Sequence, residues 1–174
     1  MYAHTTIEKL ESSSLCTFMA KDIEINDTID ISKDFGLEGP LMLHRAVYKR
    51  IMEQYNNFIF VPVRVVTYSD APPGSGLGSS STMVVSMIEA YKRLLSLPLG
   101  EYDVAKLAYQ IERIDCGLSG GKQDQYAATF GGFNFMEFNS DDRVIVNPLR
   151  VRRHIVNELE ASMILYYTGQ SRDS

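Results

Sequence analysis

Apolar and polar residues along this chain follow two different periods, and the change from one period to the other divides the chain into strands and helices. Alternating residues predict strands near 2–9, 14–20, 58–68, 133–138 and 143–146. The Asp- and Asn-rich stretch after the second of these strands is expected to be a loop. Val61, Val63 and Val65 share one side of the third predicted strand. Pro62, on the other side, indicates an edge position because proline cannot donate to a strand ladder.

Helical spacing covers much of the remaining sequence. Leu43, Val47 and Ile51 lie on one stripe and predict a helix over 40–55. Further helices are expected over 79–97 and 101–115 and, after a glycine-rich break, in a short segment that ends near Ala128. Strands and helices thus mix without strict β-α-β alternation. This order predicts an α+β fold, a two-layer sandwich of a mostly antiparallel sheet with helices packed on one face.

Length, charge and cysteine usage narrow the class of protein. The chain has 174 residues and a formal net charge of −5, which suits a globular protein of one domain or slightly more. It has no Lys/Arg stripe of the kind that binds nucleic acid, so nucleic acid is not an expected partner. Cys16 and Cys116 match no metal-ligand or C-x-x-C spacing, which suits a reducing compartment. Without a signal-peptide pattern or an apolar stretch of about 18 residues, a cytoplasmic protein with no membrane contact is expected.

The strongest chemical signal is the loop Pro72-Pro73-Gly74-Ser75-Gly76-Leu77-Gly78-Ser79-Ser80. Glycines leave backbone N–H groups open to a phosphate, and the helix that begins at Ser79 adds the positive end of its dipole, so a triphosphate is the natural ligand. The dinucleotide fingerprint is excluded because Ser79 or Ser81 replaces its third glycine, and no Gly-Lys-Ser/Thr follows as in a Walker loop. The alternative is an ordinary connection with Ser79 as the helix N-cap.

This loop, between a strand and a long amphipathic helix, resembles the second signature motif of the GHMP kinases, the family of galactokinase, homoserine, mevalonate and phosphomevalonate kinases. The resemblance implies ATP and Mg²⁺ as cofactors, with the loop around the ATP phosphates and Ser80 helping to hold Mg²⁺. The phosphate-binding residues that it implies are Pro73, Gly74, Ser75, Gly76, Leu77, Gly78, Ser79, Ser80 and Ser81.

Two carboxylates extend this resemblance. Glu112 lies at the edge of the apolar stripe of its helix, and Asp124 lies in the first turn of the short helix after the turn 117–121. Taken alone, Glu112 could be a solvated helical residue, and Asp124 could be favoured merely by the helix dipole. In the resembled family a glutamate ligand of Mg²⁺ precedes a catalytic aspartate across a Gly/Ser turn. Glu112 and Asp124 match those positions, which implies that Ser80 and Glu112 hold the metal and Asp124 is the base.

The segment around the proposed base looks most like one branch of the family, the D-glycero-D-manno-heptose 7-phosphate kinases, which phosphorylate the anomeric hydroxyl of a heptose phosphate. The resemblance therefore implies a small-molecule sugar or sugar-phosphate substrate. The substrate-binding residues that it implies are Gly120, Gly121, Lys122 and Gln123. Lys122 could anchor a sugar or phosphoryl oxygen, or it could be an exposed lysine near a helix start. Spacing does not distinguish a heptose phosphate from fucose or galactose.

The resemblance also implies how the chain divides. Residues 1–150 correspond to the N-terminal ATP-binding domain of GHMP kinases, incomplete at its start, and 151–174 to the truncated beginning of the C-terminal domain. The family's first motif is expected before residue 1 and its third motif in the C-terminal domain. A fragment of a longer protein, inactive or nearly so by itself, is therefore expected. Residues 168–174 would suit the start of a helix.

Two other functions compete with the kinase hypothesis. Residues 117–121 satisfy G-x-S-x-G, and Asp141 and His154 follow Ser119 in the order of a serine-hydrolase triad. That motif has to follow a strand, whereas Ser119 follows a predicted helix, which disfavours the hydrolase. A binding module that keeps a nucleotide-binding fold without chemistry is the second alternative. The combination of Ser80, Glu112 and Asp124 favours an enzyme over such a module.

Overall fold

The computed structural model describes residues 2–11, 13–72 and 74–166. It separates into two compact units, one that ends at Thr129 and one that begins at Phe130, and each is described by itself. The boundary at residue 150 that the family resemblance implies stays a prediction. Residues 168–174, which were expected to suit the start of a further helix, lie outside the described part. Among the described residues, no helix is both long and apolar enough to cross a membrane.

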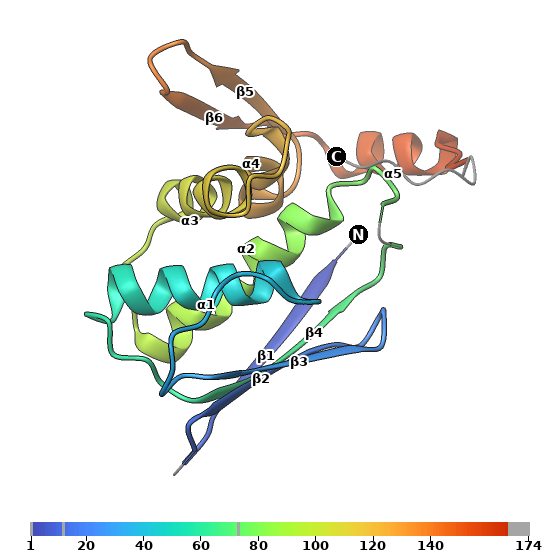
Figure 1. Ribbon diagram of the computed structural model, residues 1–174. Helices are drawn as coiled ribbons and strands as arrows, with labels where there is room; N and C mark the ends of the chain where they lie inside the picture. Colours follow the sequence, from blue (N-terminus) through green and yellow to red (C-terminus); the bar gives the residue numbers. More distant parts are fainter. Residues whose placement is uncertain (1, 12, 73, 167–174) are drawn as a thin grey trace. The chain divides into compact units, whose positions relative to one another are not determined.

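A four-stranded sheet forms one layer of the first unit (Figure 1). Its strands are β1 (Ala3–Lys9), β2 (Leu15–Ala20), β3 (Ile25–Asp30) and β4 (Val63–Ser69). Their order in the sheet is β1-β4-β2-β3. The pairs β1/β4 and β2/β3 are antiparallel, whereas β2/β4 is parallel. The predicted mostly antiparallel sheet is therefore confirmed.

Strand β3 occupies part of the stretch that was expected to be a loop, so this expectation was wrong. Asp27 and Ile29 are both buried on the inward side of β3, and the aspartate hides the alternation that marks a strand. Its charge is accommodated by Arg45, whose Nε and Nη2 atoms donate to the two carboxylate oxygens, each over 2.6 Å. This guanidinium lowers the pKa of Asp27 below its ordinary value. A buried acid with a bidentate partner can therefore sit where the pattern alone suggests solvent.

The predicted edge position of the third strand was also wrong. β4 lies between β1 and β2 and pairs with both. Pro62 precedes the first residue of β4, and its carbonyl oxygen accepts a hydrogen bond of 2.9 Å from the backbone N–H of Leu10. Because the proline stands just before the strand, its missing N–H removes no bond from the ladder.

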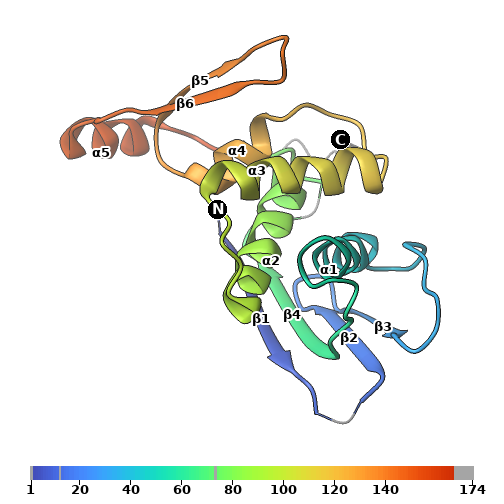
Figure 2. The same ribbon diagram turned by 90° about the vertical axis from the view of Figure 1, so that its left-hand side faces the viewer.

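Helices form the second layer, and Figures 1 and 2 show α1 and α2 along one face of the sheet. The helices of the first unit are α1 (Met42–Tyr55), α2 (Ser79–Leu95), α3 (Glu101–Tyr109), a π-helix (Gln110–Asp115) and α4 (Gln123–Phe130). Phe18 from the sheet, Tyr48 from α1 and Ile88 from α2 are fully buried where the layers meet. The predicted α+β arrangement is confirmed, and the helix predicted over 101–115 changes to π geometry in its last turns.

The second unit consists of a hairpin and a helix. Strands β5 (Asn134–Phe138) and β6 (Val144–Pro148) pair in antiparallel fashion, close to the two strands expected there. Helix α5 (Arg153–Ser162) follows and has no buried residue.

His44 joins the two layers of the first unit and makes their stability depend on pH. Its Nε2 atom lies 2.8 Å from Oγ1 of Thr67 on β4, and burial lowers the pKa of the imidazole from 6.5 to about 4. As the pH falls, His44 is therefore protonated near pH 6.5 in the unfolded chain but only near pH 4 in the folded protein. The contribution of the neutral His44 to stability is fully present above pH 6.5 and is lost progressively as the pH falls toward about 4.

We expect His44→Gln to flatten the loss of stability between these pH values. At about 1.4 kcal/mol per pKa unit, the His44 contribution is of the order of 3 kcal/mol. Chemical unfolding of the protein and its variants at a series of pH values measures it. The exposed His4 on β1 provides the matched control, His4→Gln, and an equally steep decline in His44→Gln would contradict the assignment.

Candidate active site

The glycine loop leads directly into helix α2, as the sequence predicts. Gly74, Gly76 and Gly78 have φ angles of 69°, 72° and 71°, in the left-handed region that favours glycine. Gly78 is the residue before the first helical turn, so Ser79 lies inside the helix and is not its N-cap. No acidic residue stands in the first turn of α2 itself, and the N-terminus of a helix attracts anions through its free N–H groups and its dipole. Of the predicted loop residues, Pro73 lies outside the described part.

Glu112 is buried against the start of α2. Its side chain has no exposed surface. It extends from the π-helix to two serines in the first turn of α2. Ser80 donates to Oε1 over 2.9 Å, and Ser81 donates to Oε2 over 2.7 Å. Single π turns occur often at functional sites because they redirect side chains within a helix. The solvated glutamate considered as an alternative is thereby contradicted.

Gln125 completes the hydrogen bonding of this carboxylate. Its Nε2 atom donates to Oε2 of Glu112 over 2.5 Å and to the Ser81 hydroxyl over 3.0 Å. Gln125 is fully buried, on the inner side of α4. Sequence analysis did not predict this contact, because nothing in the residues around Gln125 indicates that its side chain will meet Glu112.

Asp124 lies beside the glycine loop. It is exposed in the first turn of α4, and a Cβ atom added to Gly78 would meet its Cγ atom at 3.2 Å. The structure therefore brings Asp124, the loop and, through Ser80, Glu112 together within the first unit. This is the grouping that the sequence predicted from residues far apart in the chain.

Arg113 organises the turn that precedes Asp124. Its Nη1 atom donates to the Ser119 carbonyl over 2.6 Å, and its Nε atom donates to the Gly121 carbonyl over 3.4 Å. Gly120 has a φ of 134°, and a Cβ atom there would lie 2.8 Å from the guanidinium carbon. Only glycine fits this contact, which sequence reasoning did not anticipate. Lys122 follows, with its ammonium 5.2 Å from the centre of the Tyr109 ring.

The oxygen ligands at this position suit a magnesium ion. Mg²⁺ is commonly held by one or two carboxylates together with substrate phosphates and water. Ser80 and Glu112 supply one hydroxyl and one carboxylate at adjoining positions. Within the described ranges, no cluster of three His, Cys, Asp or Glu residues could form an all-protein metal cage. The donor set therefore fits a metal that arrives with a nucleotide.

A pocket of about 380 Å³ adjoins the glycine loop, which is within the size range of small-molecule sites. Gly74, Ser79 and Ser80 line one part of it, and Leu118 lines another. Most of the remaining lining is apolar and comes from the ends of β2 and β4 and from the start of α1. A small molecule bound there would lie next to the loop serines.

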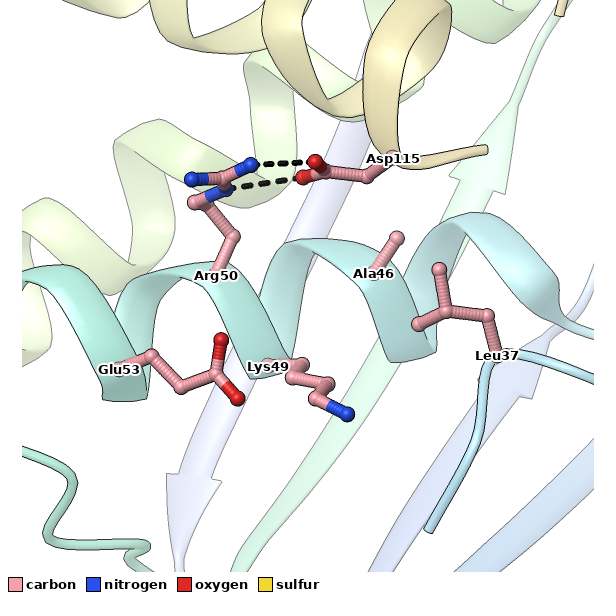
Figure 3. Close-up of a pocket in the computed structure, with 6 residues that line it drawn as sticks. All are labelled: Leu37, Ala46, Lys49, Arg50, Glu53 and Asp115. Atoms are coloured by element: carbon pink, nitrogen blue, oxygen red, sulfur yellow. Dashed lines mark hydrogen bonds and ion pairs between the residues drawn. The ribbon is translucent and has the colours of Figure 1, made fainter. Parts of the chain in front are cut away.

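A second pocket, of about 260 Å³, lies between α1 and the end of the π-helix (Figure 3). Figure 3 shows Arg50 of α1 pointing toward Asp115, and its Nε atom donates to Oδ2 over 2.9 Å while Nη2 pairs with Oδ1. Lys49 donates to the Phe35 carbonyl over 3.3 Å. Because these charges are satisfied by the protein, we interpret the pocket as a junction that attaches the π-helix to α1.

The serine-hydrolase alternative finds no support in the local structure. Ser119 follows the π-helix, whereas a nucleophile elbow has to follow a strand. Its carbonyl oxygen is held by Arg113. Asp141 and His154, the other two residues of the predicted triad, are both exposed and belong to the second unit.

Comparisons with known proteins agree on one family. The model of the N-terminal domain of GHMP kinases matches residues 42–132. A D-glycero-alpha-D-manno-heptose 7-phosphate kinase of Campylobacter jejuni is 47% identical over 174 residues, which is 100% of this chain and 51% of that protein. This chain therefore spans about half the length of that relative.

Solved structures show the same similarity. A D-glycero-D-manno-heptose 1-phosphate kinase from Bacteroides thetaiotaomicron superposes with a TM-score of 0.86 at 49% identity, over 92% of this chain and 52% of that chain. A mevalonate kinase from Methanococcus jannaschii has a TM-score of 0.70 at 16% identity, over 84% of this chain and 45% of that chain. The second match shows a shared fold alone.

We expect Arg113→Ala to loosen residues 117–121 without unfolding the protein, because it removes the donors to two loop carbonyls. Hydrogen exchange of the loop amides should become at least several-fold faster, while the midpoint of thermal unfolding changes by only a few degrees. Arg93→Ala, at an exposed arginine of α2, is the control. Unchanged exchange in Arg113→Ala would show that the guanidinium does not hold the loop.

Proposed function

Because this chain belongs to the GHMP kinase family, we propose that its protein is an ATP- and Mg²⁺-dependent sugar kinase. The proposed reaction transfers the γ-phosphate of ATP to a sugar hydroxyl, namely the anomeric hydroxyl of D-glycero-D-manno-heptose 7-phosphate. The observation that carries the proposal is the contact of Glu112 with Ser80, combined with the position of Asp124 beside Gly78. These contacts support the proposal because they bring the glycine loop, the Ser80–Glu112 pair and Asp124 into one place.

The glycine loop and the start of α2 would bind the phosphates through backbone N–H groups. The three left-handed glycines and the N-terminus of α2, whose first turn has no acidic residue, support this role for residues 74–81. Ser80 and Glu112 would hold Mg²⁺, which neutralises charge between the β- and γ-phosphates when bound. The Ser81 hydroxyl is directed to Glu112, so its contribution to phosphate binding would come from its backbone.

Asp124 would act as the base for the attacking hydroxyl. The hydroxyl oxygen forms a bond to the γ-phosphorus as the bond to ADP breaks, and the hydroxyl proton passes to the Asp124 carboxylate. The exposed position of Asp124 in the first turn of α4 lets a substrate approach it. Gly120, Gly121, Lys122 and Gln123 precede it along the chain and would contact the sugar.

The substrate class rests on the named relatives. The Campylobacter protein is called a heptose 7-phosphate kinase and the Bacteroides protein a heptose 1-phosphate kinase, so both names contain a heptose phosphate and differ in the position of the phosphate. A heptose 7-phosphate has a free anomeric hydroxyl, and we propose this hydroxyl as the acceptor here. Two free cysteines, Cys16 and Cys116, suit the reducing cytoplasm.

A nucleotide-binding module without chemistry is the alternative function. Such a module would need the phosphate loop but would have no use for a base beside it. Asp124→Asn separates the two, because it removes the proton acceptor and leaves the loop and the metal-binding pair unchanged.

We expect the full-length protein to turn over ATP with D-glycero-D-manno-heptose 7-phosphate when a panel of sugars and sugar phosphates is offered with Mg²⁺. Asp124→Asn should still bind ATP and lose at least about 100-fold in kcat, the scale of general-base catalysis. Asp34→Asn, in an exposed loop before α1, serves as the control. ATP binding without turnover on any sugar would leave the binding module as the function.

A further inference from the structure

The two oxygens of the Glu112 carboxylate have different surroundings. Oε2 accepts hydrogen bonds from Ser81 over 2.7 Å and from Gln125 over 2.5 Å. Oε1 accepts one from Ser80, over 2.9 Å. Ser81 has 1% of its surface exposed, and Gln125 and Glu112 have 0%. The Oε2 side is therefore closed by buried donors, whereas the Oε1 side faces the serine that adjoins the glycine loop.

Gln125 reaches this carboxylate from the same turn of α4 that carries Asp124. Its amide nitrogen has to face Glu112, because an amide oxygen 2.5 Å from a carboxylate oxygen would be strongly repelled. Its own oxygen Oε1 is buried without a hydrogen-bond partner among the described residues. An unsatisfied buried oxygen costs free energy, so the presence of a glutamine here is explained by the two hydrogen bonds that its amide nitrogen donates to Glu112 and Ser81.

We propose that Gln125 is a positioning residue that, with Ser81, anchors Oε2 of Glu112 and thereby presents Oε1 beside the Ser80 hydroxyl as the oxygen that meets a divalent cation. The inference rests on the proposed function, which assigns the cation to Ser80 and Glu112. A carboxylate held by one oxygen offers a single, fixed ligand, as the strict octahedral geometry of Mg²⁺ requires. Partners of this kind around a metal ligand typically contribute about 10–100-fold to metal affinity.

The same residue links the metal ligand to the base. Gln125 and Asp124 are neighbours in α4, with Gln125 directed to the interior and Asp124 exposed. The hydrogen bonds of Gln125 attach the first turn of α4 to the π-helix and to α2. The position of Asp124 against Gly78 therefore depends on the same amide that orients Glu112.

The test measures cation affinity directly, with Mn²⁺ as the probe. Binding of Mn²⁺ to the full-length protein in the presence of ADP is followed by electron paramagnetic resonance. Gln125→Met keeps the length of the side chain and removes the donor, so we expect at least about tenfold weaker Mn²⁺ binding. Gln54→Met, at an exposed glutamine of α1, is the matched control and should bind Mn²⁺ as the unchanged protein does.

A double-mutant cycle tests whether Gln125 acts through Glu112. In a Glu112→Gln background, Gln125→Met should cause no further loss of Mn²⁺ affinity. An equal loss in both backgrounds, or wild-type affinity in Gln125→Met, would overturn the proposal. If Gln125→Met does not fold, Ser81→Ala removes the other donor to the same oxygen, and wild-type Mn²⁺ affinity in that variant would likewise overturn it.

The same measurements distinguish failure of the proposed metal site from failure of the positioning role of Gln125. If Glu112→Gln itself binds Mn²⁺ and ADP as tightly as the unchanged protein, the metal assignment fails. If Glu112→Gln weakens Mn²⁺ binding and Gln125→Met does not, only the positioning role of Gln125 fails.

Discussion

A carboxylate without exposed surface has to be compensated by the protein, and at Glu112 this requirement brings three segments together. Ser80 and Ser81 come from the start of α2, Gln125 comes from α4, and Glu112 itself comes from the π-helix. Two hydroxyls and one amide, all of them neutral, donate hydrogen bonds to its two oxygens.

Ionic contacts around the π-helix hold this arrangement in place. Arg50 pairs with Asp115 at its last residue, and Arg113 binds carbonyls of the following turn. Arg50 binds a side-chain carboxylate and Arg113 binds backbone carbonyls, all of them within ten residues of Glu112 in the chain. The two arginines thus hold the surroundings of the site, while the glycine loop, for which we propose phosphate binding, offers backbone N–H groups. This division suits phosphoryl transfer, in which the protein mainly positions its substrates and stabilises charge.

Helix α2 connects the site to the core. Its first turn presents Ser80 and Ser81 to Glu112, and further along the helix Ile88 and Tyr91 are almost entirely buried. A helix anchored in this way is rigid, which suits a site that must keep its ligands in defined positions. The loop before it has left-handed backbone angles at three positions, and each is a glycine because a residue without Cβ adopts them at no steric cost.

Local pattern in the sequence determined most of the elements and the glycine loop that leads into α2. The periodicity of α1 and α2 and the order of residues 72–80 each lie within a short stretch, so no tertiary contact is needed to read them. Glu112 and Asp124 were found through the family resemblance, since each alone has an ordinary interpretation. Strand β3, the central place of β4 and the buried contacts of Gln125 were decided by the tertiary structure alone. The physical reason is that Asp27 and Gln125 are polar residues whose burial depends on Arg45 and Glu112, and those partners become neighbours only when the chain folds.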